Sequence, residues 1–238
     1  MLHIEHLTKR YGGRAAVDDL TLHIAPGEIF GFIGHNGAGK TTTLKSAAGI
    51  LPFDEGRVTV DGISMRDDPL ACKRRMAYLP DNPDLYEFMS AVKYLHFIAD
   101  IYGVGAERGA RIAEMAEAFS LTEHLAQPIS ALSHGMKQKV AIISAFLHTP
   151  RLILLDEPFV GLDPRAAHIL KEMMRRHCEA GGAILFSTHV LDTAERLCDK
   201  IAIIKGGRLL TVGSTVEVRG DASLEEVFLE LAEDEEDE

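Results

Sequence analysis

The segment at residues 34–41 combines the residue types that bind phosphate. It reads Gly-His-Asn-Gly-Ala-Gly-Lys-Thr and matches the pattern Gly-x-x-x-x-Gly-Lys-Ser/Thr. Glycines let the backbone wrap closely around phosphate oxygens, so that successive N–H groups point at the negative charge. Lys40 can then reach the β- and γ-phosphates of a nucleoside triphosphate, and the Thr41 hydroxyl can ligate Mg²⁺. We therefore predict a nucleotide site formed by Gly34, His35, Asn36, Gly37, Ala38, Gly39, Lys40, Thr41 and Thr42.

Two adjacent carboxylates, Asp156 and Glu157, follow the apolar run at residues 152–155. Because side chains alternate along a strand, these two point to opposite sides and can do different work. Asp156 is placed to hold the Mg²⁺ shell, and Glu157 can accept a proton from the water that attacks the γ-phosphate. His189 follows the next apolar strand, where it could contact the γ-phosphate and orient that water.

Apolar strands that alternate with helices must position these groups. We expect strands at 28–33, 76–79, 152–155, 183–186 and 201–204, and helices at 42–49, 166–180 and 192–198. Fully apolar strands in this alternation indicate a parallel sheet covered on both faces. The phosphate-binding segment lies between the strand at 28–33 and the helix at 42–49, which is the context that the motif requires.

Three other regions differ from this pattern. Short strands at 2–8, 17–24 and 57–60 are separated by Gly and Pro turns. From about residue 84 to 148 the spacing becomes helical, with helices expected from Ser90, at 108–119 and at 136–147. The chain ends in an amphipathic helix at 224–231 and an acidic run at 233–238, which we expect to be solvated.

Composition and charge exclude several classes of partner. The 238 residues are 46% hydrophobic, which is enough to bury a substantial core, and their formal net charge is −11. That charge repels nucleic acid unless a basic stripe offsets it, and the longest basic run covers only residues 73–75, so we expect no nucleic acid partner. Cys72, Cys178 and Cys198 lack the spacing of a metal site or a disulfide framework.

The sequence predicts a peripheral role at most for any membrane association. Residues 1–5 lead directly into a strand, without the basic and apolar regions of a signal peptide. No apolar run approaches the roughly 18 residues that a membrane-spanning helix needs.

With these motifs placed, almost the whole chain resembles the ATP-binding cassette (ABC) ATPases. The most specific resemblance is at residues 132–139, Leu-Ser-His-Gly-Met-Lys-Gln-Lys, which look like the LSGGQ signature of that family at the start of a helix. A helix N-terminus suits a phosphate electrostatically. The resemblance implies that the signature acts on ATP held by the opposite subunit, through Ser133, His134, Gly135 and Met136.

The same resemblance assigns roles to residues outside the signature. Tyr11 occupies the place of an aromatic ring that stacks on adenine, and Asp163 matches the loop that bridges the two subunits. His189 matches the switch histidine, which makes it catalytic together with Glu157. The sequence has no NKxD motif for guanine, so the implied cofactors are ATP and Mg²⁺, the metal being held by Thr41 and Asp156.

Two positions depart from the family pattern. Asp81 stands where the family usually has glutamine; an acid can still bind Mg²⁺ or its water and take part in subunit communication, but it lacks the amide donors. In the signature, His134 replaces the first glycine and Met136 replaces the glutamine. If the backbone at His134 needs a positive φ, histidine is strained there.

The resemblance also implies the fold and its division. We expect an α/β fold: a P-loop NTPase core with a mixed sheet and helices on both faces, an antiparallel β arm and an α-helical subdomain. The ABC ATPase domain would cover residues 1–218, with the core at 1–83 and 149–218 and the helical subdomain at 84–148. Residues 219–238 would form the C-terminal helix and acidic tail.

The implied partners are an integral-membrane permease on a separate chain and a second ABC ATPase subunit, in a homodimer or a heterodimer. The implied location is cytoplasmic, at the inner face of the cell membrane. The signature residues 135–139 and the segment 224–228 look most like the exporter branch. Two alternatives stay open: a soluble ABC ATPase that acts in translation or DNA repair, and a regulatory subunit that binds nucleotide without hydrolysing it.

Overall fold

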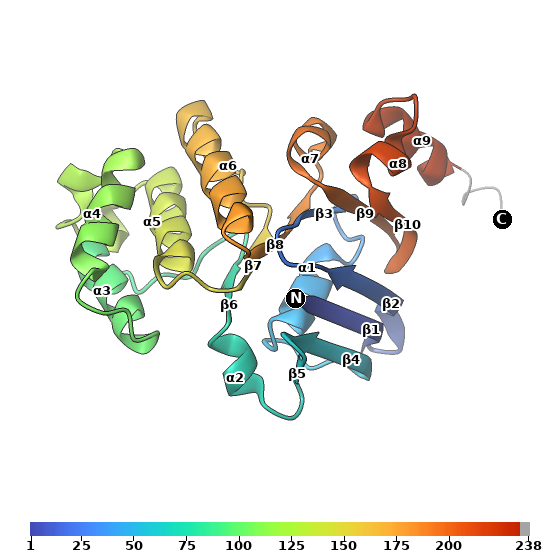
Figure 1. Ribbon diagram of the computed structural model, residues 1–238, viewed down its shortest axis with the longest axis horizontal. Helices are drawn as coiled ribbons and strands as arrows, with labels where there is room; N and C mark the ends of the chain where they lie inside the picture. The colour runs from blue at the N-terminus through green and yellow to red at the C-terminus, as the bar shows by residue number, and fades with distance from the viewer. Residues whose placement is uncertain (234–238) are drawn as a thin grey trace.

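A six-stranded sheet in the order β10-β9-β3-β8-β7-β6 forms the centre of the molecule (Figure 1). This computed structural model describes residues 1–233, with side chains through residue 231. The strands from β9 to β6 run parallel, and β10 is antiparallel to β9 at the edge. In chain order the strands are β3 (Ile29–Ile33), β6 (Met76–Leu79), β7 (Leu152–Asp156), β8 (Ala183–Thr188), β9 (Lys200–Lys205) and β10 (Arg208–Ser214).

Alternate side chains of the parallel strands enter two different hydrophobic cores. In β7, Ile153 and Leu155 belong to one core, and Leu152 and Leu154 belong to the other. All four are fully buried, and each contributes about 1.5–3 kcal/mol of hydrophobic stabilisation. This is why the strand has no polar face and reads as a continuous apolar run.

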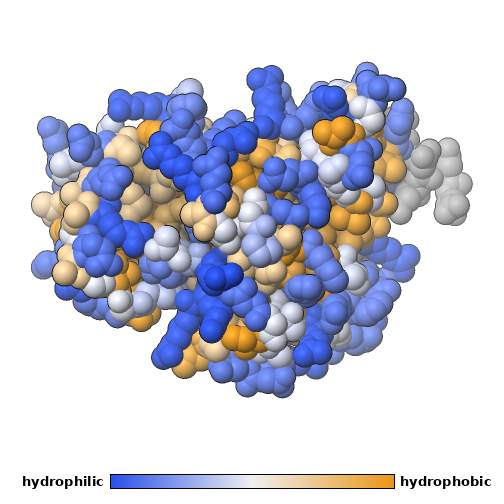
Figure 2. All heavy atoms as spheres, in the orientation of Figure 1, coloured by the Kyte–Doolittle hydropathy of each residue, from blue (hydrophilic) through white to orange (hydrophobic). Residues whose placement is uncertain are grey.

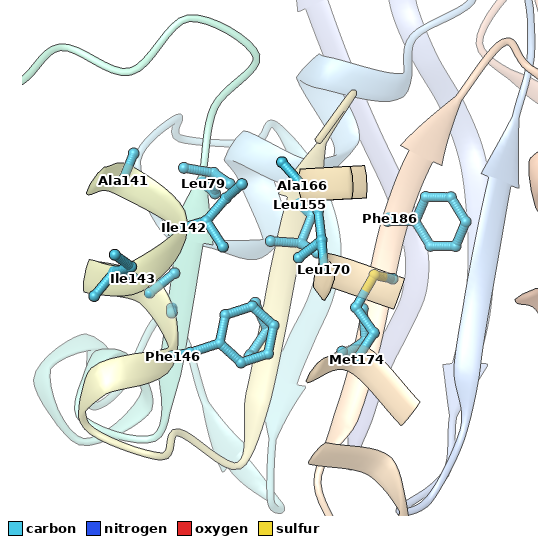
Figure 3. Close-up of a cluster of buried hydrophobic side chains, with 14 of the residues drawn as sticks. Leu79, Ala141, Ile142, Ile143, Phe146, Leu155, Ala166, Leu170, Met174 and Phe186 are labelled. Atoms are coloured by element: carbon cyan, nitrogen blue, oxygen red, sulfur yellow. The ribbon is translucent and has the colours of Figure 1, made fainter. Parts of the chain in front are cut away.

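The first core packs helices against one face of the sheet. It joins β7 to the helices α5 (His134–Leu147), α6 (Pro164–Glu179) and α7 (Leu191–Leu197). Figure 3 shows part of this cluster, where Phe146 of α5, Leu155 of β7 and Leu170 of α6 lie together. The same core extends into α3 (Ala91–Ile101) and α4 (Arg108–Ala118), which pack with α5 as a separate group of helices (Figure 1).

The second core joins the opposite face of the sheet to α1 (Lys40–Ala47), α2 (Pro69–Lys73) and a four-stranded antiparallel sheet. The strand order of that sheet is β2-β1-β4-β5. Its strands are β1 (Leu2–Tyr11), β2 (Arg14–Ile24), β4 (Glu55–Val60) and β5 (Ile63–Ser64). Residues 61 and 62 form the turn between β4 and β5, as the Asp-Gly pair predicts.

After β10, the chain ends in α8 (Thr215–Arg219) and α9 (Leu224–Glu233), beside α7. Short 3₁₀ turns at Thr122–His124 and Ile129–Ala131 connect α4 to α5. The acidic run expected at 233–238 lies, from residue 234 onward, outside the described residues. Every helix within residues 1–233 is too short or too polar to cross a bilayer.

The structure confirms the expected α/β class, the parallel sheet with helices on both faces, the antiparallel β arm and the helical insertion. The differences are local. The helix expected at 42–49 begins at Lys40, and the helix expected at 136–147 begins at His134, because Ser133 caps it. The sequence did not predict α2, β5, β10, α8 or the two 3₁₀ turns.

Candidate nucleotide-binding site

The phosphate-binding segment forms the loop between β3 and α1, and glycine geometry shapes it. Gly37 and Gly39 have φ values of 83° and 109°, in the left-handed region that other residues rarely adopt. A Cβ atom at Gly39 would lie 2.5 Å from the carbonyl oxygen of Ala16, so only glycine fits this close approach. The loop thus brings backbone N–H groups and the N-terminus of α1 together, as a phosphate site requires.

Two adjoining cavities open along this loop. The first has a volume of about 200 Å³ and is lined by Ala16, His35, Asn36, Gly37, Gly39, Lys40, Thr41, Thr42, Asp81 and Glu157. The second has a volume of about 380 Å³ and is lined by Tyr11, Arg14, Ala15, Ala16, Gly37 and Gly206. Because Ala16 and Gly37 line both, the predicted adenine-stacking ring and the predicted phosphate site adjoin. Of the predicted loop residues, Gly34 and Ala38 are buried beneath the cavity surface.

Tyr11 is suited to contact with a ligand because 52% of the residue is exposed. The Nζ atom of Lys9 lies 5.4 Å from the centre of the Tyr11 ring. A flat, exposed ring at the edge of a cavity can stack on a purine base.

Lys40 is held inside the loop by hydrogen bonds. Its Nζ atom donates to the carbonyl oxygens of Gly34, at 2.6 Å, and His35, at 3.2 Å. The same atom lies 3.4 Å from Oε1 of Glu157. With only 6% of Lys40 exposed, the ammonium group is compensated by these three oxygens rather than by water.

Asp156 has the geometry of a metal ligand. Only 1% of the residue is exposed; its Oδ1 accepts a hydrogen bond from Ser187 Oγ at 2.5 Å, while its buried Oδ2 has no hydrogen-bond partner. Burial raises the pKa of Asp156, and hydrogen bonds from the Ser187 and Thr41 hydroxyls oppose the rise. A buried carboxylate oxygen without a partner, beside the Thr41 hydroxyl, matches the hard oxygen ligands that Mg²⁺ prefers.

The protein supplies few of the ligands that such an ion needs. Among residues 1–233, there is no group of three or more His, Cys, Asp or Glu side chains with metal-site geometry. This agrees with the way Mg²⁺ is usually bound, through one or two protein groups together with phosphate oxygens and water.

Glu157 lies between a cation and an imidazole. Its Oε2 is 3.0 Å from His189 Nδ1, and its Oε1 faces Lys40. The side chain of Glu157 is 14% exposed and that of His189 is 49% exposed. Glu157 has a φ of 46°, and its N–H donates to Ser187 Oγ at 3.0 Å. A non-glycine residue held in this region costs roughly 1–3 kcal/mol, and such strain clusters at functional sites.

Asp81 lies beside this group, after the end of β6. It lines the same cavity as Glu157, and its carboxylate adds to the raised pKa of Asp156. Its Oδ1 accepts a hydrogen bond from the N–H of Asn82 at 2.7 Å. The structure therefore brings Asp81 to the site, although the family pattern has glutamine at this position.

The signature residues lie apart from this cavity. None of Ser133, His134, Gly135 and Met136 is among the residues that line either cavity. Ser133 caps α5, with its Oγ accepting a hydrogen bond from the N–H of Met136 at 3.3 Å. His134 is the first residue of α5 and does not have a positive φ. The backbone strain considered for histidine at this position therefore does not arise.

The signature instead contacts the loop that was expected to bridge two subunits. A Cβ atom at Gly135 would lie 2.9 Å from the carbonyl oxygen of Gly161. Asp163 caps α6, with Oδ1 accepting from the N–H of Ala166 at 2.8 Å, and its Oδ2 lies 2.7 Å from Nζ of Lys139 in α5. The start of α5 and the loop before α6 thus form one surface.

Several residues of the site were not singled out from the sequence, among them Arg14, Ala15 and Gly206, which line the second cavity. Ala16 lines both cavities, and Ser187 bonds both Asp156 and the backbone of Glu157. Phe228 of α9 contacts the ring of His35. The triplet 187–189 at the end of an apolar strand was a usable signal for Ser187; Ala16 and Phe228 carry none, because their contacts are made between distant segments.

Comparison with known proteins agrees with this geometry. The family model described as "ABC transporter" matches residues 17–160. The ABC-type transporter ATP-binding protein EcsA of Bacillus subtilis (strain 168) is 35% identical, over 98% of this chain and 97% of EcsA. The linearmycin resistance ATP-binding protein LnrL of the same organism is 33% identical, over 92% of this chain and 70% of LnrL.

A solved structure described as the ATP-binding subunit of an ABC transporter superposes with a TM-score of 0.94 at 38% sequence identity. The match covers 98% of this chain and all of that one. The chain belongs to the ABC transporter family, in which it is an ATP-binding subunit and an ATPase.

Proposed function

We propose that this chain hydrolyses ATP in the cavity between the phosphate-binding loop and Glu157, and that it powers export through a separate membrane permease. The observation that carries the proposal is that Lys40 and Glu157 line one cavity, with Asp156 and His189 directly beside Glu157. These four residues come from three segments of the chain. No simpler role for a buried lysine, a strained glutamate and an unpartnered carboxylate oxygen explains all of them.

Glu157 is the general base in this proposal. Its carboxylate accepts a proton from water as the water oxygen attacks the γ-phosphorus, and the bond from that phosphorus to the β–γ bridging oxygen breaks. ADP and inorganic phosphate are the products. His189, 3.0 Å from Glu157 Oε2, orients the carboxylate and contacts the γ-phosphate.

Lys40 and the loop bind the phosphates. To reach the β- and γ-phosphates, Nζ of Lys40 exchanges its present carbonyl partners, Gly34 and His35, for phosphate oxygens. Asp156 and Thr41, with Asp81 beside them, would hold Mg²⁺, which would neutralise charge that develops on the phosphate oxygens. Tyr11 stacks on adenine from the adjoining cavity.

A second subunit completes the site. Since Ser133 and Gly135 lie away from the cavity of their own chain, they act on the ATP of another cassette. Ser133 brings a hydroxyl and the start of α5 to that phosphate, and Asp163 lies on the same surface for contact between subunits. The partner is a second copy or a related chain.

The helical subdomain, residues 84–148, offers a surface for the permease, while residues 1–83 and 149–218 form the ATPase core. The exposed aromatic residues of the subdomain include Tyr86, exposed by 48%, Phe88, by 85%, and Phe97, by 37%. Their rings cluster, with Tyr86 centred 5.9 Å from Phe88 and 5.6 Å from Phe97. We call these three residues the aromatic patch. An exposed apolar cluster of this kind suits a helix of a protein partner.

Tyr86 and Phe88 of the patch follow soon after Asp81, which lines the catalytic cavity. A further cavity of about 490 Å³, lined by residues that include Asn82, Glu87 and His134, lies between Asp81 and the signature. A permease helix seated on the patch would therefore respond to movement of both. Figure 2 shows that hydrophilic residues cover much of the visible surface, with apolar areas between them.

Export is the proposed direction, at the inner face of the cell membrane. It is supported by the segments 135–139 and 224–228 and by the resistance function in the name of LnrL.

The test is a pull-down of affinity-tagged Glu157→Gln from detergent-solubilised membranes of the source cell, with ATP and Mg²⁺ present. We expect to recover a multi-spanning protein, and to lose it when Phe88→Glu is added. Val216→Glu is the matched control, because Val216 is 73% exposed in α8, outside the patch. Recovery of only soluble assemblies, such as ribosomes or repair complexes, would refute the permease partner.

A further inference from the structure

The C-terminal helix α9 contacts the nucleotide site directly. It packs beside α7 and α8 at the end of the sheet away from the helical subdomain (Figure 1). Leu224 is fully buried and Phe228 is 8% exposed, and both belong to the core that contains Ile33 at the end of β3. The helix is therefore part of the folded domain and not an appendage.

Phe228 packs on the phosphate-binding loop. Its ring lies edge-to-face on the imidazole of His35, with the ring centres 4.7 Å apart and an angle of 65° between the planes. Aromatic pairs in this geometry stabilise beyond the area that they bury. His35 is otherwise exposed, and it also lines the phosphate cavity, so one ring joins α9 to the cavity wall.

This contact adds a second side-chain anchor at the start of the loop, beside the hydrogen bonds that Lys40 donates to the carbonyls of Gly34 and His35. The glycines of the loop leave the backbone free, and Gly37 has nothing within 4 Å of its Cβ position. The inner half of the loop is held by the N–H of Gly207, which donates to the carbonyl of Ala38 at 2.9 Å. At His35, the backbone carbonyl accepts hydrogen bonds from Lys40 Nζ and from the N–H of Ala38, both at 3.2 Å, and the side chain packs on Phe228.

The other end of α9 is tied to the helix that follows His189. The N–H of Leu224 donates to Glu195 Oε2 in α7 at 3.1 Å, and Arg219 pairs with Glu195 Oε1 at 3.1 Å. These contacts, the Leu224 hydrogen bond first, lower the pKa of Glu195. Since α7 begins at Leu191, two residues after His189, α9 contacts the supports of both loops that face the phosphates.

We propose that Phe228 is a positioning residue for nucleotide binding, which holds the His35 side of the phosphate-binding loop in its binding geometry. The inference rests on the nucleotide site proposed above. A loop that is ordered before the ligand arrives loses less conformational entropy on binding. Removal of the Phe228 ring therefore weakens nucleotide binding while leaving the chemical step, at Glu157, largely unchanged.

The test is a calorimetric titration of the full chain with ADP and Mg²⁺, with the Tm of each variant measured alongside. Phe228→Leu keeps an apolar side chain but removes the ring, and we expect it to raise the Kd by about two- to tenfold. His35→Ala should raise the Kd similarly, and the double variant no further, because both remove the same contact. His35→Phe retains a ring pair and should raise the Kd less than His35→Ala does.

A kinetic measurement separates positioning from loss of structure. For Phe228→Leu, KM for ATP should rise by a similar factor while kcat stays within about twofold, as expected for an interaction made equally in the ground and transition states. Leu229→Ala is the matched control on α9, since Leu229 is 52% exposed, and its Kd should be unchanged.

Two outcomes would overturn the inference: an unchanged Kd for Phe228→Leu, or effects of His35→Ala and Phe228→Leu that simply multiply. A lowered Tm with native Kd would assign Phe228 to stability alone. Lys40→Ala distinguishes a failure of the underlying site. If Lys40→Ala still binds ADP with native affinity, the proposed nucleotide site is refuted. If Lys40→Ala loses binding and Phe228→Leu does not, only the proposed role of Phe228 is refuted.

Discussion

Glu157 is held by contacts on three sides. Its backbone N–H donates to Ser187, its two carboxylate oxygens face Lys40 and His189, and its φ is 46°. Each contact limits the directions in which the carboxylate can point. If Glu157 is the base, as proposed, a carboxylate restrained in this way needs little rearrangement before it accepts a proton, and that would compensate for the backbone strain.

Replacing Glu157 with Gln should lower kcat by about 10²–10⁴-fold, the range over which general bases contribute, while ATP still binds. The amide keeps the shape of the side chain but cannot take the proton. Phosphate release by the chain measures the first effect, and ATP titration measures the second. Glu172→Gln, on the exposed face of α6, should behave like the native chain. A kcat within fivefold of native would remove Glu157 from the role of base.

Replacing Asp156 with Asn should stabilise the fold in the absence of nucleotide and abolish hydrolysis. Burial raises the pKa of Asp156, so folding favours the protonated acid; this stabilisation is present at low pH and is lost as the pH rises through the folded-state pKa. Asparagine resembles the protonated acid and stays neutral at pH 7.

The measurement is Tm between pH 5 and 8. At pH 8 the variant should melt a few degrees above the native chain, since about 1 kcal/mol shifts Tm by roughly 2–4 °C at this size. The gap should narrow as the pH falls towards the pKa of Asp156. Mg²⁺ with ATP should raise the Tm of the native chain more than that of the variant. A difference in Tm between the variant and the native chain that widens as the pH falls would contradict the expected direction of this pH dependence.

At the residue scale, the sequence identifies the polar candidates for the site but does not identify the residues that pack around them. Lys40, Asp156 and Glu157 are recognisable because their chemistry requires a fixed spacing from a strand end. Ala16 and Phe228 reach the site only through packing between distant segments, and nothing local marks them. The hydrogen-bond partners of Lys40 likewise depend on how the loop folds back on its own helix.

At the scale of the elements, the phosphate-binding loop contains two glycines whose substitution should cost different amounts of folding free energy. Both Gly37 and Gly39 have positive φ, but only at Gly39 would a Cβ meet backbone, 2.5 Å from Ala16 O. Gly37 faces open space. The strand pairing that brings Ala16 there is therefore part of the nucleotide site.

We expect Gly39→Ala to lower both stability and ATP affinity strongly, by roughly 2–4 kcal/mol in unfolding free energy, because backbone on both sides must shift. Gly37→Ala carries only the strain of a left-handed alanine, about 1 kcal/mol. Urea unfolding and ATP titration of the two variants check the difference. Equal losses of stability and affinity in the two variants would mean that the positive φ alone determines the cost, and that the close contact of β2 with Gly39 does not contribute.

The elements that the sequence missed have a common physical reason. The helix α8 has five residues and depends on a capping box, in which Ser214 and Glu217 bond each other's backbone, rather than on a periodic apolar face. Likewise, α2 depends on the Asp68 cap. The edge strand β10 is only partly buried, so its pattern lacks the apolar run of β7. Longer elements with a buried face were predicted to within a few residues.

At the scale of the whole molecule, the nucleotide cavity and the signature lie on different parts of one chain. The cavity is lined from β2, the phosphate-binding loop and the ends of β6 and β7. The signature begins α5, beside the loop before α6. In the proposed function these are the two halves of a nucleotide site, and association with another cassette would join them.

We therefore expect ATP to drive dimerisation of Glu157→Gln, and Ser133→Arg in the same background to prevent it, because arginine fills the space of the phosphate contact. Sedimentation velocity with ATP and Mg²⁺ measures the mass. Thr122→Arg, an exposed position of the helical subdomain, is the control and should still dimerise. A dimer that forms with Ser133→Arg would place the interface elsewhere; a chain that stays monomeric in every variant requires a different partner subunit.

The internal partners of Lys40 have a further consequence for turnover. Two carbonyl oxygens and a carboxylate already surround its ammonium group, so a departing nucleotide does not leave a bare buried cation behind. The protein itself competes with the phosphates for that charge. Such competition should weaken the binding of ADP and phosphate, and thus favour their release after hydrolysis.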